Sequence, residues 1–88
     1  MKVIWYQQAL EGRERIAEYI YEYFGVKSRT RFLREVRWTT RMLKRTPNLG
    51  RIDPLFYDRA MTYRSIIING LSKMVYYVKD DTIRIAAF

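Results

Sequence analysis

The 88-residue chain has no cysteine and no histidine. The first absence excludes disulfide bonds, and the two together exclude the usual zinc sites and any nucleophile that histidine would activate. The four glycines are isolated from one another, which leaves no glycine-rich loop to hold a nucleotide phosphate. We therefore expect no metal and no cofactor. Any catalysis would have to come from Arg, Lys, Tyr, Asp or Glu.

Long apolar runs are also missing. The longest, residues 74–78, is far shorter than the roughly 20 residues that a membrane-spanning helix needs, and the N-terminus has no secretory pattern. The hydrophobic fraction of 49% and the aromatic fraction of 16% are too high for a disordered tail. The sequence therefore predicts one folded, soluble and cytoplasmic domain, residues 1–88, with no membrane partner.

The positive charge is concentrated in one quarter of the chain. The formal net charge is +8, yet residues 27–51 contain nine of the 17 basic residues against a single acidic one, Glu35. These nine are Lys27, Arg29, Arg31, Arg34, Arg37, Arg41, Lys44, Arg45 and Arg51. A charge gathered on one element is typical of a surface that meets a polyanion or an acidic partner.

The apolar pattern predicts one strand and two helices in the first half of the chain. Residues 2–6 are β-prone, and residues 8–24 repeat apolar side chains at helical spacing before Gly25. Ser28 is a suitable N-cap for a second helix that runs to residue 45, before Thr46-Pro47. Residues 48–60 show no period and are expected to form a loop.

Three strands are predicted in the last third, over residues 63–68, 71–78 and 82–88. Asn69-Gly70 is typical of a two-residue type I′ turn, and Asp80-Asp81 would form the second turn. The order is then β-α-α-β-β-β, an α+β domain with a helical hairpin on one face of an antiparallel sheet. The last strand would leave an uncovered sheet edge, which would make the domain only marginally stable.

One candidate site lies on the second helix. At 100° per residue seven basic side chains lie within an arc of about 140°, with Trp38 near one edge: Lys27, Arg31, Arg34, Arg37, Arg41, Lys44 and Arg45. The candidate residues for binding a nucleic acid or a protein partner are Arg31, Arg34, Arg37, Trp38, Arg41 and Arg45. Phosphates pair with guanidinium groups and an unstacked base can meet the Trp38 ring, whereas an exposed aromatic residue can also mark a protein interface. Alternatively, the charges are merely solvated and Trp38 packs on a neighbouring loop.

A second candidate site lies on the sheet. If Asn69-Gly70 form a two-residue turn, Ile66 opposes Lys73 and Arg64 opposes Val75, so the two cations share a face. The candidate catalytic residues are Arg64, Lys73, Tyr77 and Arg84, since cations with a phenol can stabilise charge that develops on a phosphate. The same residues could be ordinary charges on a solvated sheet face. The helix side would carry Tyr63, Ile67, Met74, Tyr76, Val78, Ile83, Ile85 and Ala87.

These elements and residues together resemble the RelE/ParE superfamily of toxins from bacterial type II toxin–antitoxin modules. The resemblance rests on the opening strand, the helical hairpin, Leu43 with Pro47 and Gly50-Arg51, and the runs 63–65 and 73–78. It implies the α+β fold of that superfamily. It also implies a small basic toxin that an acidic antitoxin wraps and holds inactive.

The two branches of the superfamily imply two targets. RelE-like members cleave messenger RNA in the ribosomal A site, whereas ParE-like members bind DNA gyrase without comparable catalytic residues. By position, Arg64 and Lys73 match basic residues of the RelE-like enzymes, while Ile66 replaces a second lysine. The family usually continues into a polar segment with Arg and, in the nucleases, a catalytic Tyr. This sequence ends at Phe88, which implies either truncation or an activity that is weakened or absent.

The sequence thus predicts a toxin that acts on one of these targets. The concentrated charge and the predicted face with Arg64 and Lys73 favour ribosome-dependent mRNA cleavage, the activity of an mRNA interferase. Non-enzymatic inhibition of DNA gyrase is the alternative, and a basic nucleic-acid-binding module is a third possibility.

Overall fold

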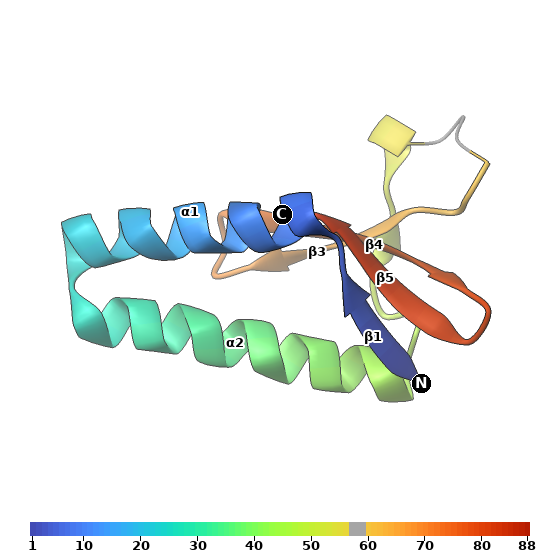
Figure 1. Cartoon of the computed structure of the whole chain (residues 1–88), viewed down its shortest axis with the longest axis horizontal. Helices are drawn as coiled ribbons and strands as arrows, with labels where there is room; N and C mark the ends of the chain where they lie inside the picture. The colour runs from blue at the N-terminus through green and yellow to red at the C-terminus, as the bar shows by residue number, and fades with distance from the viewer. Residues whose placement is uncertain (57–59) are drawn as a thin grey trace.

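The computed structural model describes residues 1–56 and 60–88. Its elements are β1 (Lys2–Trp5), α1 (Gln7–Phe24), α2 (Val26–Arg45), β2 (Arg51–Ile52), a 3₁₀ helix (Pro54–Phe56), β3 (Arg64–Ile68), β4 (Ser72–Lys79) and β5 (Thr82–Ala87). The strands form one sheet in the order β1-β5-β4-β3-β2, with the helical hairpin beside it (Figure 1). The predicted α+β fold is confirmed. The sheet is mixed because β1 runs parallel to β5.

The helical hairpin reverses at a single residue. Gly25 has φ 89°, its N–H donates to the Tyr21 carbonyl oxygen, and its own carbonyl oxygen accepts from the Arg29 N–H. Glycine adopts this backbone conformation without steric cost, so α2 begins directly at Val26. The prediction that Ser28 caps the second helix is therefore wrong, because Ser28 lies inside the first turn of α2.

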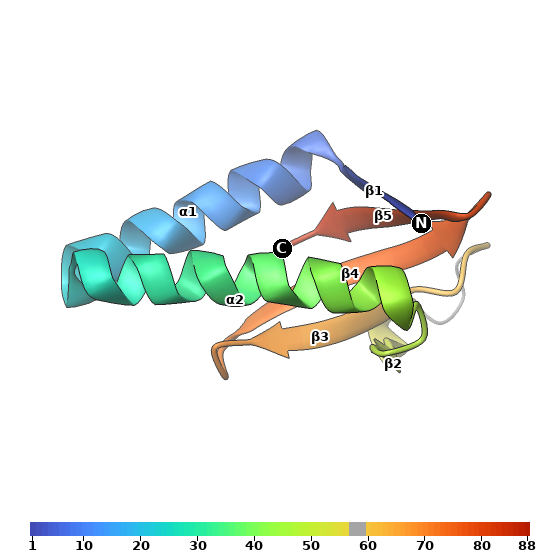
Figure 2. The same cartoon turned by 90° about the horizontal axis from the view of Figure 1, so that it is seen from below.

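The core lies between the hairpin and one face of the sheet. Its buried members are Ala9, Ala17 and Ile20 of α1, Phe32, Val36 and Leu43 of α2, and Ile68, Met74, Tyr76, Ile83 and Ile85 of the sheet. The closed end of the hairpin extends beyond the sheet (Figure 2). No helix in residues 1–56 and 60–88 is long and apolar enough to cross a membrane.

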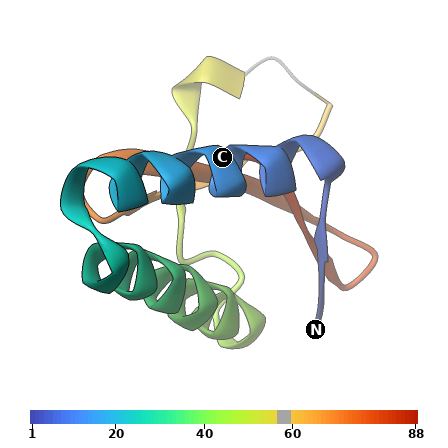
Figure 3. The same cartoon turned by 60° about the vertical axis from the view of Figure 1, so that its left-hand side comes forward.

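Part of the predicted loop over 48–60 is ordered secondary structure. β2 pairs with β3, and the 3₁₀ helix follows directly. Figures 1 and 3 show this short helix and α2 on opposite sides of β3 and β4. Residues 57–59, which also belong to the predicted loop, lie outside the described residues. The segment after α2 therefore passes round the edge of the sheet to its outer face, the face away from the helices.

The predicted uncovered edge at residues 82–88 is wrong. β5 lies inside the sheet, because β1 pairs with it in parallel from Lys2 opposite Thr82 to Trp5 opposite Ile85. The ring of Phe88 stacks on Trp5, with centroids 6.2 Å apart, and packs against the Phe32 ring at 5.8 Å. The N-terminal strand thus covers the edge that the sequence left open.

The register of the β3–β4 hairpin differs by one residue from the prediction. Asn69 and Gly70 have the expected positive φ values of 56° and 74°. The first cross-strand pair, however, is Ile68 with Ser72, which leaves Leu71 as an extra loop residue with 89% of its surface exposed. One extra residue reverses the faces of one strand relative to the other.

The shifted register changes which side chains share a face. Arg64 pairs with Tyr76 on the helix side, whereas Ile67 pairs with Lys73 on the outer face. The predicted clustering of Arg64 with Lys73 is therefore wrong. Three predicted helix-side residues, Tyr63, Ile67 and Ala87, belong to the outer face; Ala87 pairs with Val75 after a bulge in β5. The β4–β5 turn has the expected register, with Tyr77 opposite Arg84.

Candidate functional site

The basic face of α2 is exposed as predicted. Arg31, Arg34, Arg37, Arg41 and Arg45 all lie at the surface, and within the described residues none of them forms an ion pair. Trp38, also on α2, is 56% exposed. Within the described part of the domain these arginines have no ion-pair partner and the Trp38 ring is not buried. This face is therefore available to a partner.

Arg64 holds a loop on the helix side of the sheet. Its Nη1 donates a hydrogen bond to the Gly50 carbonyl oxygen at 2.9 Å. The buried Tyr76 hydroxyl donates to the Pro47 carbonyl oxygen at 2.7 Å and accepts from the Gly50 N–H at 2.8 Å. Burial raises the pKa of Tyr76, which keeps the hydroxyl protonated for this donation. Arg64 and Tyr76 therefore position the chain between α2 and β2.

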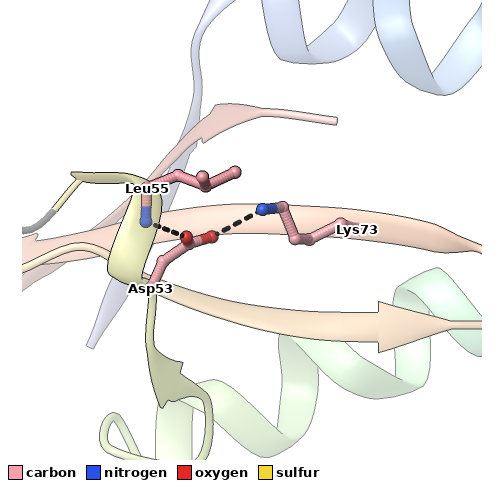
Figure 4. Close-up of polar contacts among 3 residues, drawn as sticks. All are labelled: Asp53, Leu55 and Lys73. Carbon is pink, nitrogen blue, oxygen red and sulfur yellow. Dashed lines mark hydrogen bonds and ion pairs between the residues drawn. The ribbon is translucent and has the colours of Figure 1, made fainter.

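Lys73 is paired with a buried carboxylate on the outer face (Figure 4). Its Nζ lies 2.9 Å from Oδ2 of Asp53, a residue only 1% exposed. Oδ1 of Asp53 accepts the Leu55 N–H at 2.9 Å, which caps the 3₁₀ helix. The hydrogen bond from Lys73 holds the pKa of the Asp53 carboxyl below its ordinary value of 3.8. The positive charge of Lys73 is thus largely neutralised within the fold.

This pairing predicts an acid-dependent loss of stability. The folded-state pKa of Asp53 is lowered, so its contribution is complete above the unfolded-state pKa and is lost as the pH falls through the folded value. Urea unfolding measured from pH 7 to pH 2 should therefore show a steep loss below about pH 4. Asp53→Asn keeps the cap acceptor but loses the charge; it should cost about 2 kcal/mol at pH 7 and flatten the acid limb. An acid limb as steep as that of the wild type would contradict this role.

Tyr77 and Arg84 lie together on the outer face among other aromatic residues. The Tyr77 hydroxyl is hydrogen-bonded to that of Tyr6, and its ring meets Tyr63 edge-on with centroids 5.1 Å apart. The hydrogen bond with Tyr6 and burial raise the pKa of Tyr77. Arg84 lies opposite Tyr77, and its Nε is buried without a hydrogen-bond partner among the described residues.

The four predicted catalytic residues thus fall into three places. Arg64 is on the helix side, while Lys73 and Tyr77 are separated by four positions, or about 13 Å, along β4. Of the predicted group, the structure brings together only Tyr77 and Arg84. Lys73 also lies on the outer face, but it is paired with Asp53.

Sequence reasoning missed Asp53 and Tyr6. For Asp53 a signal existed, because an aspartate followed by Pro54 is a typical start of a short helix. For Tyr6 no signal existed, because its contact with Tyr77 depends on the parallel pairing of β1 with β5. Local sequence patterns carry no information about contacts between residues that are far apart in the chain.

The fold and the exposed basic helix define a small α+β domain, with a helical hairpin on a mixed sheet and a surface open to an acidic partner. The model of a family described as "ParE toxin of type II toxin-antitoxin system, parDE" matches residues 3–88. The chain belongs to this family of ParE toxins, and membership implies an antitoxin partner.

Solved structures agree with the fold. The chain is similar to a structure described as "Chromosomal ParDE TA system from P. aeruginosa", with 16% sequence identity and a TM-score of 0.75. The match covers 99% of this chain and 91% of that one. No curated protein sequence matches the chain. At this identity the likeness concerns the fold alone.

Proposed function

We propose that this toxin inhibits DNA gyrase by binding it and does not cleave RNA. The observation that carries the proposal is that both cations on which the RNase prediction depended already have partners within the fold. Lys73 is neutralised by Asp53, and Arg64 is bonded to the Gly50 carbonyl oxygen on the other side of the sheet. The match to the ParE family supports the same target, because ParE-like members of the superfamily bind gyrase.

The chemistry of RNA cleavage gives the physical reason. Cleavage needs cations aimed at the charge that develops on the scissile phosphate. A lysine that already contacts a carboxylate at 2.9 Å contributes less to such a charge. The raised pKa of Tyr77 also makes its phenolate costly to form, which weakens this residue as a base.

Within this proposal, Arg84 contacts the target. Its buried Nε lacks a partner among the described residues, and it projects from the outer face next to Tyr77. A guanidinium beside aromatic rings is well suited to a protein interface, where Arg and Tyr are enriched. The basic face of α2 would bind a second acidic or nucleic-acid surface.

Ribosome-dependent mRNA cleavage is the alternative that one observation favours. Tyr77 and Arg84 are direct cross-strand neighbours, so a phenol and a guanidinium lie side by side on the outer face. Such a pair could bind a phosphodiester and stabilise its transition state. In this reading Arg84 is a catalytic residue, and its loss would lower the cleavage rate itself.

Two parallel assays separate these functions. The free toxin should inhibit gyrase-catalysed supercoiling of a relaxed plasmid and leave a defined mRNA intact on programmed ribosomes. Arg84→Gln should weaken gyrase inhibition about tenfold. Arg15→Gln, which makes the same charge change on exposed α1, is the matched control and should inhibit like the wild type. Ribosome-dependent cleavage with no effect on gyrase would overturn the proposal in favour of the RNase.

A further inference from the structure

The helical hairpin projects beyond the sheet that it covers. In both Figure 1 and Figure 2 its closed end extends past the turn between β3 and β4. Large apolar side chains of this overhanging part stay in contact with solvent, since Tyr19 is 56% exposed and Phe24 66%. Single exposed apolar residues are ordinary, but several around one hollow mark a binding site.

Such a hollow lies beside these residues. It is a cavity of about 420 Å³ between α1, α2 and the β3–β4 turn, and we call it the overhang pocket. This volume is typical of sites for small molecules. No acidic residue in the described parts of the chain lines it. Five of its lining residues are apolar: Ile16, Tyr19, Ile20, Phe24 and Leu71.

Leu71 lines the pocket from the sheet side. It is the extra residue of the β3–β4 turn, and its N–H donates to the Ile68 carbonyl oxygen at 3.3 Å. The side chain contributes little to the core, because 89% of the residue is exposed. The turn therefore presents a leucine to the overhang pocket without a packing role in the fold.

The pocket is elongated and has different chemistry at its two ends. Its lining residues on α1 run from Arg15 to Phe24, a distance of about 13 Å along the helix. Because the hairpin reverses at Gly25, Arg31 of α2 lies level with Tyr19, six residues from the turn on either side. Both lining arginines are therefore near the inner end of the pocket, and Phe24 is at the closed end of the hairpin.

The two arginines are free to bind an anion. Within the described residues neither Arg15 nor Arg31 forms an ion pair. Glu11 and Glu18 lie one helical turn from Arg15, and Glu35 lies one turn from Arg31, but these carboxylates are exposed and line no part of the pocket. Guanidinium groups bind a carboxylate through paired, charge-assisted hydrogen bonds. The inner end of the pocket is thus suited to one carboxylate.

We propose that the overhang pocket binds a fatty acid of about ten carbons. Arg15 and Arg31 hold the carboxylate, and the acyl chain lies along α1 towards Phe24. An extended chain of ten carbons is about 12 Å long, which matches the length of the pocket. An acyl chain also has no polar backbone groups, so it can lie between apolar walls without leaving hydrogen bonds unmade. The inference goes beyond the proposed function, since it involves neither gyrase nor the antitoxin.

A series of ligands tests the chemistry of the pocket. Isothermal titration calorimetry should show one decanoate bound per toxin, with a Kd of about 0.1 mM. Octanoate should bind about tenfold more weakly, because it buries two fewer CH₂ groups. Decyltrimethylammonium has the same chain with the opposite charge and is the matched control, which should not bind. Equal binding of this cation would contradict the proposal, because the arginines would then have no role.

Variants test the two ends of the pocket separately. Arg31→Gln should weaken decanoate binding about tenfold, whereas Arg37→Gln makes the same charge change on α2 outside the pocket and should bind like the wild type. Leu71→Ala should weaken binding about fivefold. Its matched control is Leu55→Ala, which truncates a leucine that is 75% exposed and lies outside the pocket. Circular dichroism at each decanoate concentration establishes that the protein stays folded.

The remaining outcomes are also decisive. In NMR spectra of the wild-type toxin, decanoate should shift the amide resonances of residues 69–72, and unchanged resonances there would overturn the proposal. Equal losses in Arg31→Gln and Arg37→Gln would mean that the basic face of α2 attracts the anion without a pocket. Loss of decanoate binding in the complex with the antitoxin of the same module would assign the pocket to that chain. A stoichiometry that falls as the toxin concentration rises would assign it to a second copy. Either assignment would refute the fatty-acid site, whatever the supercoiling assay gives.

Discussion

Replacing Gly50 with alanine is expected to lower the free energy of unfolding by about 3 kcal/mol. A Cβ at this position would lie 2.8 Å from Cε1 and 2.9 Å from the hydroxyl oxygen of Tyr76, and 2.9 Å from the Ser65 carbonyl oxygen. The Tyr76 ring is completely buried and the Ser65 group is backbone, so neither can move away cheaply. The substitution would also disturb the hydrogen bonds of Tyr76 with Gly50 and Pro47.

Denaturant unfolding of three variants tests this packing. Leu49→Ala, at the exposed neighbouring position, is the control and should change stability by less than about 0.5 kcal/mol. Tyr76→Phe should cost about 2 kcal/mol, because it leaves buried groups of Gly50 and Pro47 without partners. The double variant Gly50→Ala, Tyr76→Phe should cost less than the sum, since part of the clash involves the hydroxyl. Wild-type stability in Gly50→Ala would show that the loop can move away.

The second large effect concerns the rate at which the antitoxin binds. Arg34, Arg41 and Arg45 are exposed and without ion pairs in the described part of the chain, so their field reaches an approaching acidic chain. Changing all three to glutamine should slow association about 30-fold at 50 mM salt. At 500 mM salt the difference should shrink to a few-fold, because screening shortens the range of the field to about 4 Å.

Stopped-flow fluorescence at the two salt concentrations gives the association rates. The matched control changes Lys2, Arg15 and Lys79 to glutamine, which removes the same charge from exposed positions scattered over the domain. This control should slow association only a few-fold. Equal slowing by both triple variants would mean that total charge, and not its concentration on α2, attracts the antitoxin.

The helices could be predicted from the sequence because their signals are local. Ala9, Ala17 and Ile20 recur at helical spacing and are buried, and the glycine after Phe24 ends α1 as expected. The basic face of α2 followed from the same period. Predicting this basic face required no knowledge of what the opposite face of the helix packs against.

The prediction of the sheet site was wrong for an equally specific reason. Asn69 and Gly70 have the backbone conformation that their identities predict. Nothing in the sequence indicates that Leu71 is an extra loop residue. Because side chains alternate between the two faces of a strand, this one residue places Arg64 and Lys73 on opposite faces of the sheet. The Asp53–Lys73 pair also joins segments on either side of β3, which no local pattern describes.

The parallel pairing of β1 with β5 has a consequence for biosynthesis. β1 is made first, but its partner is the last strand of the sheet, and Tyr6 and Trp5 contact Tyr77 and Phe88. Contacts of such large sequence separation form late and slow folding. A nascent chain can form its helical hairpin on the ribosome, but the sheet cannot close until residues 82–87 have left the exit tunnel. Until then β1 has no partner strand, so the toxin fold is incomplete in a nascent chain that already has its helical hairpin.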